Sequence, residues 1–452
     1  MQITRHMLTI PATGTKGERR VHYRRCGKGP PLLMVHQSPR SSAEYAALMQ
    51  SWGEYFTCIA PDTPGFGQSD PLPGTPDIDD FAAALLEFMA AAGLDHCPAY
   101  GFHSGGIILV TALRHAPERF TCLAVGGYAI WTPEEMRIFG EQYLPEFRPA
   151  PYGEHLTWLW NRMLEQSWFF PWFDTRDAAR LSVAHADLPR VQQAVMEMLD
   201  AGDAYRAGYG AVLRAPRDIP APDVATPPVL ISAYAGDPLQ AHIDRLGPMP
   251  ATWQAMKVAT PADHHGQSLA FLQAHSGNLN PPPLAEAVDE GWVAAGGALI
   301  HWRGRRGAAR LVLHGPAGEL TEPGPDEIAI DVPGHGLSDP ADDFIGTIAA
   351  AREALGAGAI IWPAVPPGDP AQLYPDLTPD RYGGHLIRAW SAARAEAIFA
   401  PWYAANAAHA IPLTQGALDP TAIASRARAR LRAGSAARAW HESLTSLQGA
   451  QE

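Results

Sequence analysis

The segment Ala-Tyr-Gly-Phe-His-Ser-Gly-Gly at residues 99–106 contains two side chains that could act as a base or a nucleophile. An apolar, strand-like run leads into it and a helical pattern follows. This pattern indicates a sharp strand-to-helix turn of the type that presents a nucleophile at its tip. Ser104 at the tip would be the ordinary arrangement. His103 would instead bring an imidazole, which titrates near neutral pH.

The small residues around the turn favour His103 as the tip. The turn is strained, so the residues two before and two after the tip must be small to clear the neighbouring strand and helix. With His103 at the tip, these residues are Gly101 and Gly105. With Ser104 at the tip, the phenyl ring of Phe102 would occupy a position that needs glycine or alanine. We therefore predict that His103 stands at the tip.

Two later segments contain further residues that could belong to a site. Asp237 ends an apolar run in Ala-Tyr-Ala-Gly-Asp-Pro, where it could belong to a site or could cap the helix predicted after it. His264 and His265 are adjacent in Ala-Asp-His-His-Gly. A single histidine in a surface loop is common, but two adjacent ones favour a role in a site, and the sequence does not choose between them.

Short apolar runs alternate with helical patterns through most of the first 280 residues. Strands that are apolar throughout and alternate with helices predict a parallel sheet covered on both faces. The segment 132–222 departs from this pattern, because it is rich in tryptophan and helical in period, and it predicts a helical insertion. The predicted strands lie within residues 18–27, 30–39, 55–70, 97–101, 121–129, 227–237 and 251–265.

The order and spacing of these motifs resemble the α/β-hydrolase fold with a helical cap. The resemblance implies a core of residues 1–131 and 223–280, with the cap at 132–222, and it implies a hydrolase. It rests on Val-His-Gln-Ser-Pro at 35–39, Asp-Thr-Pro-Gly-Phe-Gly-Gln-Ser-Asp at 62–70, the turn at 101–105, Arg-His-Ala-Pro-Glu-Arg-Phe at 114–120, Gly-Asp-Pro at 236–238 and the late histidines.

The resemblance also implies catalytic roles. Asp237 takes the acid position, and His264 or His265 takes that of the late histidine. The oxyanion hole would be formed by the backbone N–H groups of Ser104 and Gln37, and such a donor typically contributes about a hundredfold or more in rate. His103 departs from the family pattern, in which the tip is normally Ser, Asp or Cys, and thus from the ordinary acyl-enzyme mechanism.

Four roles are open for His103. It could be a general base that takes a proton from substrate or water, which is our working hypothesis and needs no cofactor. It could be a nucleophile that forms a transient acyl-imidazole. It could bind zinc or another divalent metal together with Asp237 and a late histidine, His265. The site could also be inactive, in which case the protein would be a non-catalytic ligand-binding protein.

The candidate substrate-binding residues lie mainly in the cap. They are His155, Trp158 and Trp172, although the tryptophans could equally form the cap's own core, and His36 beside the oxyanion turn. An aromatic cap favours a medium-sized apolar or aromatic substrate. We expect hydrolysis, or a related cofactor-free lyase step, on a small carbonyl compound that reacts at an ester, a lactone or a C–C bond.

The second half of the chain repeats motifs of the first. The repeat predicts an internal duplication in residues 281–452, with core strands at 296–375 and cap-like helices at 380–445. This copy lacks an elbow, an acid strand and a late histidine. We therefore expect the second half to have a structural role, in which it docks on the cap of the first half or mediates a homodimer. The matching pairs are 62–70 with 331–339, 32–39 with 310–317, 152–160 with 382–390, and 169–173 with 399–403.

Composition narrows the possible partners. The chain has 452 residues and a formal net charge of −13, and its short arginine runs are typical of solvated faces rather than of nucleic-acid or membrane contacts. Its four cysteines show no metal-binding or redox spacing. The N-terminus has no signal pattern and no apolar stretch reaches membrane-spanning length. We expect a cytoplasmic protein that acts on a small molecule.

Overall fold

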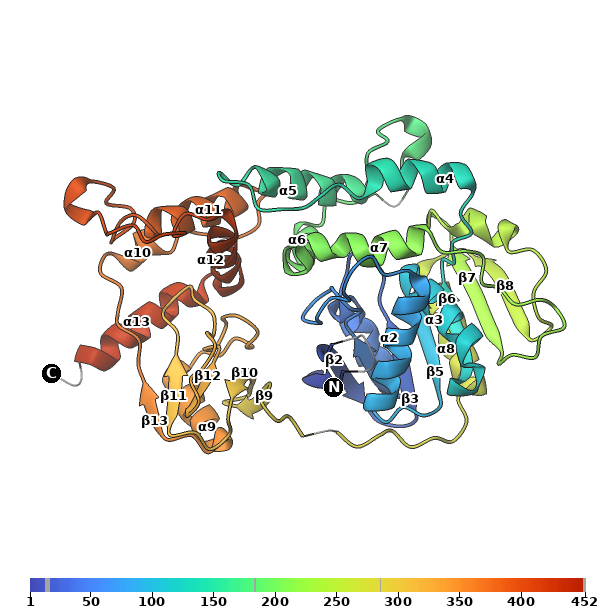
Figure 1. Ribbon diagram of the computed structural model, residues 1–452, viewed down its shortest axis with the longest axis horizontal. Helices are drawn as coiled ribbons and strands as arrows, with labels where there is room; N and C mark the ends of the chain where they lie inside the picture. Colours follow the sequence, from blue (N-terminus) through green and yellow to red (C-terminus); the bar gives the residue numbers. More distant parts are fainter. Residues whose placement is uncertain (13–16, 183, 285, 450–452) are drawn as a thin grey trace. The chain divides into compact units, whose positions relative to one another are not determined.

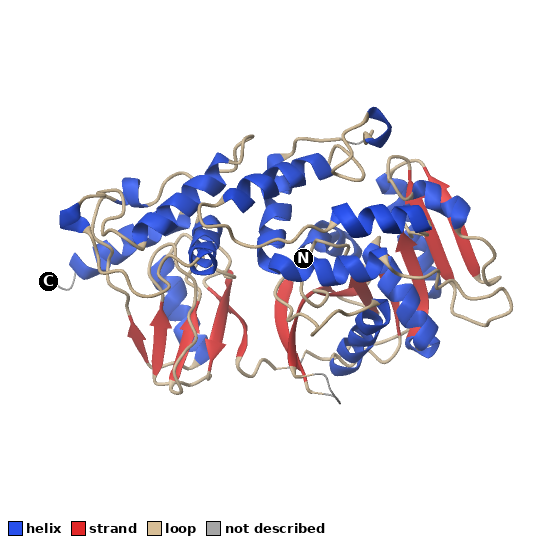
Figure 2. Cartoon of the chain, turned by 45° about the horizontal axis from the view of Figure 1, so that its top comes forward, coloured by secondary structure: helices blue, strands red, loops and turns tan. Residues whose placement is uncertain are grey.

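A computed structural model describes residues 1–12, 17–182, 184–284 and 286–449. The chain forms two compact units. The first comprises residues 1–147, 162–187 and 193–286, and the second comprises residues 148–161, 188–192 and 287–452. In Figure 2 the strands of each sheet lie side by side, with helices against the sheet.

The first unit contains an eight-stranded sheet in the order β1-β2-β4-β3-β5-β6-β7-β8 (Figure 1). β2 pairs antiparallel with β1 and β4, and all other neighbours pair in parallel. The strands are β1 (Thr4–Ile10), β2 (Arg19–Gly27), β3 (Pro31–Val35), β4 (Thr57–Pro61), β5 (Cys97–Phe102), β6 (Phe120–Gly126), β7 (Val229–Tyr234) and β8 (Trp253–Val258).

Strand β3 shows why the central strands are apolar throughout. Leu33 and Val35 belong to a core cluster with residues of α2 (Ile78–Ala91) and α3 (Ser104–His115). Leu32 and Met34 point to the opposite face and belong to a cluster with α1 (Ala46–Trp52) and α8 (Pro261–His275). Successive side chains of a strand alternate between faces, so a sheet covered on both sides needs apolar residues at every position.

The segment 132–222 is helical, as predicted, but the structure divides it differently from the expected single cap. Residues 148–161 and 188–192 belong to the second unit. The remaining residues of the segment stay in the first unit. The helices are α4 (Pro133–Ile138), α5 (Glu154–Gln166), α6 (Leu188–Ala201) and α7 (Tyr205–Leu213).

The second unit contains a five-stranded sheet in the order β13-β11-β12-β10-β9. Read from β9, this order and its strand directions match β1-β2-β4-β3-β5 of the first sheet, which is what an internal duplication predicts. The elements are β9 (Glu290–Ala295), β10 (Ala298–Gly304), β11 (Arg310–Leu313), β12 (Glu327–Ile330), β13 (Ala359–Ile361), α9 (Phe344–Leu355), α10 (Pro370–Leu373), α11 (Gly384–Glu396), α12 (Pro420–Ala433) and α13 (Ala436–Gly449).

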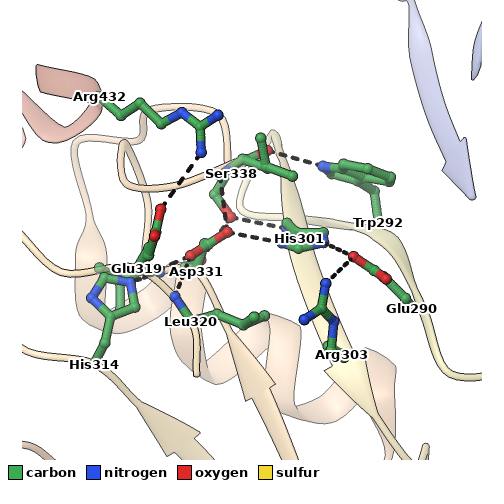
Figure 3. Close-up of polar contacts among 12 residues, drawn as sticks. Glu290, Trp292, His301, Arg303, His314, Glu319, Leu320, Asp331, Ser338 and Arg432 are labelled. Atoms are coloured by element: carbon green, nitrogen blue, oxygen red, sulfur yellow. Dashed lines mark hydrogen bonds and ion pairs between the residues drawn. The ribbon is translucent and has the colours of Figure 1, made fainter. Parts of the chain in front are cut away.

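The two units repeat a buried hydrogen-bond network. In the first unit, His22 Nδ1 lies 2.8 Å from Asp62 Oδ2, and the His22 backbone N–H donates to Ser69. In the second, His301 Nδ1 lies 2.8 Å from Asp331 Oδ2, and the His301 backbone N–H donates to Ser338 (Figure 3). The repetition extends from strand order to individual hydrogen bonds. These residues therefore maintain the fold in both units.

In the second unit, residues from α5 pack against α11 in a reciprocal arrangement. The Trp160 ring lies 5.0 Å from His385, and the Trp390 ring lies 4.9 Å from His155, both edge to face. The Trp160 indole N–H also donates to the carbonyl of Arg381 at 3.0 Å. An offset of 230 residues relates Trp160 to Trp390 and His155 to His385. The two segments that share this sequence motif thus contact each other through equivalent side chains.

None of the helices in the described part of the chain has both the length and the apolar character needed to cross a lipid bilayer.

Candidate active site

The turn between β5 and α3 places His103 at its tip. β5 ends at Phe102, α3 begins at Ser104, and His103 between them has φ 48° and ψ −114°. A non-glycine residue in this region costs about 1–3 kcal/mol and persists where the surroundings enforce it. A Cβ on Gly105 would lie 1.9 Å from the Val35 carbonyl oxygen, so only glycine fits there.

Gly101 meets the same restriction on the other side of the turn. A Cβ at this position would lie 2.7 Å from the Gly105 carbonyl carbon. The prediction that glycines two before and two after His103 clear the neighbouring strand and helix thus agrees with the geometry. The Phe102 ring stacks on the His103 ring with centroids 4.1 Å apart.

His103 pairs directly with Asp237. The His103 Nε2 lies 3.1 Å and 3.2 Å from the two carboxylate oxygens of Asp237, which follows β7. Asp237 also accepts a hydrogen bond from the Leu239 N–H at 2.8 Å. Burial alone would raise the pKa of Asp237, but these contacts, His103 first, outweigh burial and lower it. Asp237 is therefore ionised and holds Nε2 of His103 in its protonated, donating form.

This tautomer leaves the other ring nitrogen of His103 as the basic one. A neutral imidazole carries one N–H and one lone pair, and the Nε2–H is donated to Asp237. The lone pair is then on Nδ1. The His103 side chain is 24% exposed whereas that of Asp237 is fully buried, so the imidazole is the reachable member of the pair.

The late histidines do not join this pair. His264 is fully buried, with Nδ1 2.8 Å from the Ser232 hydroxyl and Nε2 3.0 Å from the Tyr100 hydroxyl. Burial lowers the pKa of His264 to about 4, so its imidazole is neutral. Both ring nitrogens thus have partners inside the sheet. The structure gives His264 a place in the interior rather than contact with His103.

His265 also lies away from His103. Its ring packs edge to face on Trp52 at 6.3 Å, and burial lowers its pKa. The cause is the early start of α8, which begins at Pro261 with a capping box between Thr260 and Asp263. Both late histidines therefore fall in the first turns of a helix and not in a loop over the site.

The oxyanion turn after β3 differs from the expectation. The Gln37 N–H, predicted as an oxyanion donor, donates to Glu44 Oε1 at 2.8 Å, and the Gln37 side-chain amide donates to Glu44 Oε2 at 3.0 Å. The Ser104 N–H opens α3, where the first N–H groups of a helix lack partners within the helix. The structure thus leaves the Ser104 amide available and engages that of Gln37.

The predicted substrate-binding residues have other contacts. His36 is 1% exposed; its Nδ1–H donates to the Gln37 carbonyl at 2.9 Å and its Nε2 accepts from the Thr63 N–H at 2.8 Å. His314 of the second unit makes the same two bonds, to Gly315 and Val332. Because the described residues of the second unit contain no strand–turn–helix elbow, this shared arrangement belongs to the fold rather than to a substrate.

The three cap residues are likewise outside the pocket described below. His155 packs against Trp390 and accepts from the Ala150 N–H at 3.0 Å. Trp158 is half-buried in the same helix. The Trp172 indole N–H donates to the Tyr143 carbonyl at 3.3 Å.

A mostly apolar pocket opens beside His103. It encloses about 430 Å³ of space, part of it open solvent. The expected aromatic wall is present, but it is formed by residues that we did not single out from the sequence. These residues come from several separate elements, among them α3, the helical segment Phe139–Tyr143 and α7, and no single local pattern connects them. The pocket is lined by Ser38, His103, Ser104, Ile107, Ala129, Trp131, Phe139, Tyr143, Phe170, Tyr209, Val212, Leu213 and Leu239.

The alternative metal site does not assemble. Across the described ranges there is no group of three or more His, Cys, Asp and Glu side chains that could hold a metal ion. His103 and Asp237 are together, but the third proposed ligand, His265, packs on Trp52.

Comparison with known proteins agrees with this fold. Residues 30–158 match the family model described as alpha/beta hydrolase fold. The chain is 31% identical over 135 residues to haloalkane dehalogenase 2 of Mycobacterium tuberculosis, covering 30% of this chain and 47% of that protein. It is 34% identical over 90 residues to soluble epoxide hydrolase of Corynebacterium sp. strain C12, covering 20% of this chain and 31% of that protein. The chain thus spans less than half the length of these relatives.

Among solved structures, an esterase from Thermogutta terrifontis is 20% identical, with a TM-score of 0.42 over 59% of this chain and 96% of that one. The mixed eight-stranded sheet, the strand–turn–helix elbow and the family match define this protein as one with the α/β-hydrolase fold. The predicted fold class is thereby confirmed.

Proposed function

We propose that this protein is a cofactor-free hydrolase of a small carbonyl compound, with His103 as its general base. The observation that carries the proposal is the direct pairing of His103 with the ionised Asp237 beside an apolar pocket. The relatives named as a haloalkane dehalogenase and an epoxide hydrolase support hydrolysis as the reaction class. Bond types that fit are an ester, a lactone or an activated C–C bond.

The proposed reaction starts from the hydrogen bond between His103 Nε2 and Asp237, which leaves Nδ1 as the basic nitrogen of a neutral imidazole. His103 Nδ1 takes a proton from water as the water oxygen bonds to the substrate carbonyl carbon, and the carbonyl π electrons move to oxygen. Asp237 stabilises the imidazolium that results. The tetrahedral intermediate then expels its leaving group, which receives the proton from Nδ1. The same base could remove a proton from a carbon acid, which would be the related lyase step.

The experiment is turnover of a panel of phenyl esters, alkyl esters and lactones by the full chain and its variants. General-base catalysis contributes about 10²–10⁴ in rate, so His103→Gln should lose at least a hundredfold in kcat and Asp237→Asn a substantial part of that. His96→Gln is the matched control, because His96 is exposed and lies outside the pocket. A fluorophosphonate should leave Ser104 unlabelled, and EDTA should not change the rate.

Three results would contradict the proposal. The first is labelling of Ser104, which would make serine the nucleophile. The second is loss of activity in EDTA with recovery on adding zinc, which would point to a metal hydrolase. The third is tight binding of an ester or lactone without turnover, unchanged in His103→Gln, which would point to a ligand-binding protein.

A further inference from the structure

In the oxyanion turn, the backbone N–H groups of Gln37 and Ser38 already donate hydrogen bonds to other side chains of the protein. Gln37 donates its N–H to Glu44 at 2.8 Å. Ser38 donates its N–H to the Ser104 hydroxyl oxygen at 2.5 Å. A carbonyl oxygen beside His103 would therefore find the Ser104 N–H but no backbone N–H from residues 37 and 38. A tetrahedral oxyanion is best stabilised by more than one preorganised donor, so a second one must come from elsewhere.

The Ser38 hydroxyl meets this need. The Ser104 hydroxyl, which accepts from the Ser38 N–H, donates its own proton to Ser38 Oγ at 3.2 Å. Ser38 Oγ is thus already an acceptor, and its own proton has no acceptor within the described part of the chain. Ser38 is 8% exposed and lines the same pocket as His103. Its hydroxyl is a fixed donor whose proton remains for a ligand.

We propose that the Ser38 hydroxyl and the Ser104 N–H together form the oxyanion site. This inference rests on the proposed function. Ser38 is then a catalytic residue, because its O–H touches the oxygen that becomes negative. The Ser104 hydroxyl is a positioning residue, because it acts only by holding Ser38. Glu44 also positions the turn by occupying both donors of Gln37.

No proton is transferred by Ser38 in this scheme. As water attacks, the carbonyl oxygen gains the electron pair of the π bond, and the Ser38 O–H strengthens its hydrogen bond to that oxygen. When the bond to the leaving group breaks, the pair returns to re-form the carbonyl. The proton taken from water by His103 goes to the leaving group, so Ser38 ends as it began.

The test compares Ser38→Ala with Ser268→Ala in kcat and KM on the ester or lactone that the full chain turns over fastest. Ser268 is the matched control, because its hydroxyl is fully buried in α8 and has no hydrogen-bond partner within the described residues. Removing one oxyanion donor typically costs about 10²–10³ in kcat, so Ser38→Ala should lose about a hundredfold with little change in KM. The kcat of Ser268→Ala should stay within about threefold of the wild-type kcat, because no oxyanion donor is removed. Ser104→Ala should fall between the two.

A second readout separates charge stabilisation from a structural effect. Phenyl methylphosphonate is a tetrahedral anion that imitates the intermediate formed from phenyl acetate, and phenyl acetate is its planar, neutral counterpart. Calorimetry should show that Ser38→Ala weakens phosphonate binding about a hundredfold, whereas its effect on phenyl acetate binding, measured in a His103→Gln background, should be small. If Ser38→Ala does not fold, Ser38→Cys, with its weak S–H donor, takes its place.

A kcat loss below tenfold in the Ser38 variant overturns the inference, as does equal weakening of both ligands. This failure differs from failure of the proposed function. If His103→Gln loses activity and Ser38→Ala does not, the general base stands and the oxyanion donor is wrong. If His103→Gln retains activity, the proposed function itself fails. Where no ester or lactone is turned over, the phosphonate comparison alone decides about Ser38.

Discussion

The indole ring of Trp160 lies directly over Gly383, so that a methyl group added to this glycine would come within 2.6 Å of the ring. The reverse pair is also present: Trp390 lies over Gly153, with 2.9 Å between an added Cβ and the ring. Each tryptophan of the repeated motif thus covers the glycine of the other copy. This exchange explains why residues 148–161 belong to the second unit.

We expect Gly383→Ala to destabilise the second unit by about 1–3 kcal/mol, because the backbone there has φ +71° and the added methyl group meets the ring. Urea unfolding followed by tryptophan fluorescence measures the change. Gly416→Ala is the control, since its φ of +79° is similar and its surroundings are open. Equal shifts for the two variants would show that backbone strain alone acts and that the contact contributes nothing.

His22 and His301 should respond to pH in opposite directions, although they occupy equivalent places. Arg5 faces Arg24 beside His22, whereas Glu290 faces Arg303 beside His301. Burial mainly lowers the pKa of His22, which is neutral. His301 lies between Asp331 at 2.8 Å and Glu290 at 3.1 Å, and these carboxylates raise its pKa despite burial.

Proton linkage gives the direction in which the stability of each unit changes with pH. The stability that His301 contributes is fully present below its unfolded pKa of about 6.5 and is lost as pH rises through its higher folded value. The contribution of His22 is present above about 6.5 and is lost as pH falls towards its lower folded value. Hydrogen exchange of the β9 and β10 amides should therefore accelerate more steeply above pH 7 than that of β1 and β2.

Glu290→Gln should weaken this dependence in the second unit. Removing one of the two carboxylates lowers the pKa of His301, so the loss of protection above pH 7 should shrink by on the order of 1 kcal/mol. Asp326→Asn, which changes an exposed carboxylate of the same unit paired with Arg305, should leave the pH profile unaltered. Unchanged exchange in Glu290→Gln would mean that His301 does not titrate in this range.

The pocket should also prefer substrates with a second acceptor. The hydroxyl groups of Tyr143 and Tyr209 lie 3.1 Å apart and share one hydrogen bond, so one of their two protons remains for a ligand. A net hydrogen bond contributes about 0.5–1.5 kcal/mol, so Tyr209→Phe should raise KM about threefold to tenfold for an ester with a distal ether oxygen. The all-carbon isostere should show no such change; an equal rise for both would indicate altered packing.

Gly127 offers a test of the His103–Asp237 distance. A Cβ there would lie 2.4 Å from His103 Cδ2 and 2.8 Å from Asp237 Oδ2, so Gly127→Ala should force the two side chains apart. Displacements near 1 Å can cost about a hundredfold in rate, which is the loss expected in kcat. Gly202→Ala, at φ +53° with open surroundings, controls for the backbone. Full activity of Gly127→Ala would show that the pairing is not needed.

The sequence predicted what depends on local sterics and on strand patterning. Apolar runs marked the central strands β3 to β7, and Gly101 and Gly105 marked the tip of the turn, because a side chain at either position collides with backbone. β1 was not predicted, and the strand predicted at 251–265 ends at Val258, before α8 begins. The position of Asp237 after β7 was implied by the resemblance to the α/β-hydrolase fold. The sequence suggested a contact between His103 and Asp237 only as part of the alternative metal site with a late histidine. In the structure these two side chains pair with each other, and neither late histidine joins them.

What could not be predicted depends on distant partners. His264 lies in α8, which begins at Pro261, and its position is fixed by hydrogen bonds to Tyr100 of β5 and Ser232 of β7. The Gln37 N–H donates a hydrogen bond to the side chain of Glu44, which lies seven residues later in the sequence. The pocket wall comes from several segments, and no local pattern connects them.

His36 and His314 give experiments on this chain an internal standard. They make the same pair of hydrogen bonds, His36 beside the proposed active site and His314 in the second unit, whose described residues contain no elbow. The same substitution can therefore be made twice in one polypeptide, under one set of conditions. The change in stability caused by His314→Gln measures how much this pair of hydrogen bonds contributes to folding. Any additional loss of turnover in His36→Gln then measures how much the same hydrogen bonds contribute to catalysis at the neighbouring site.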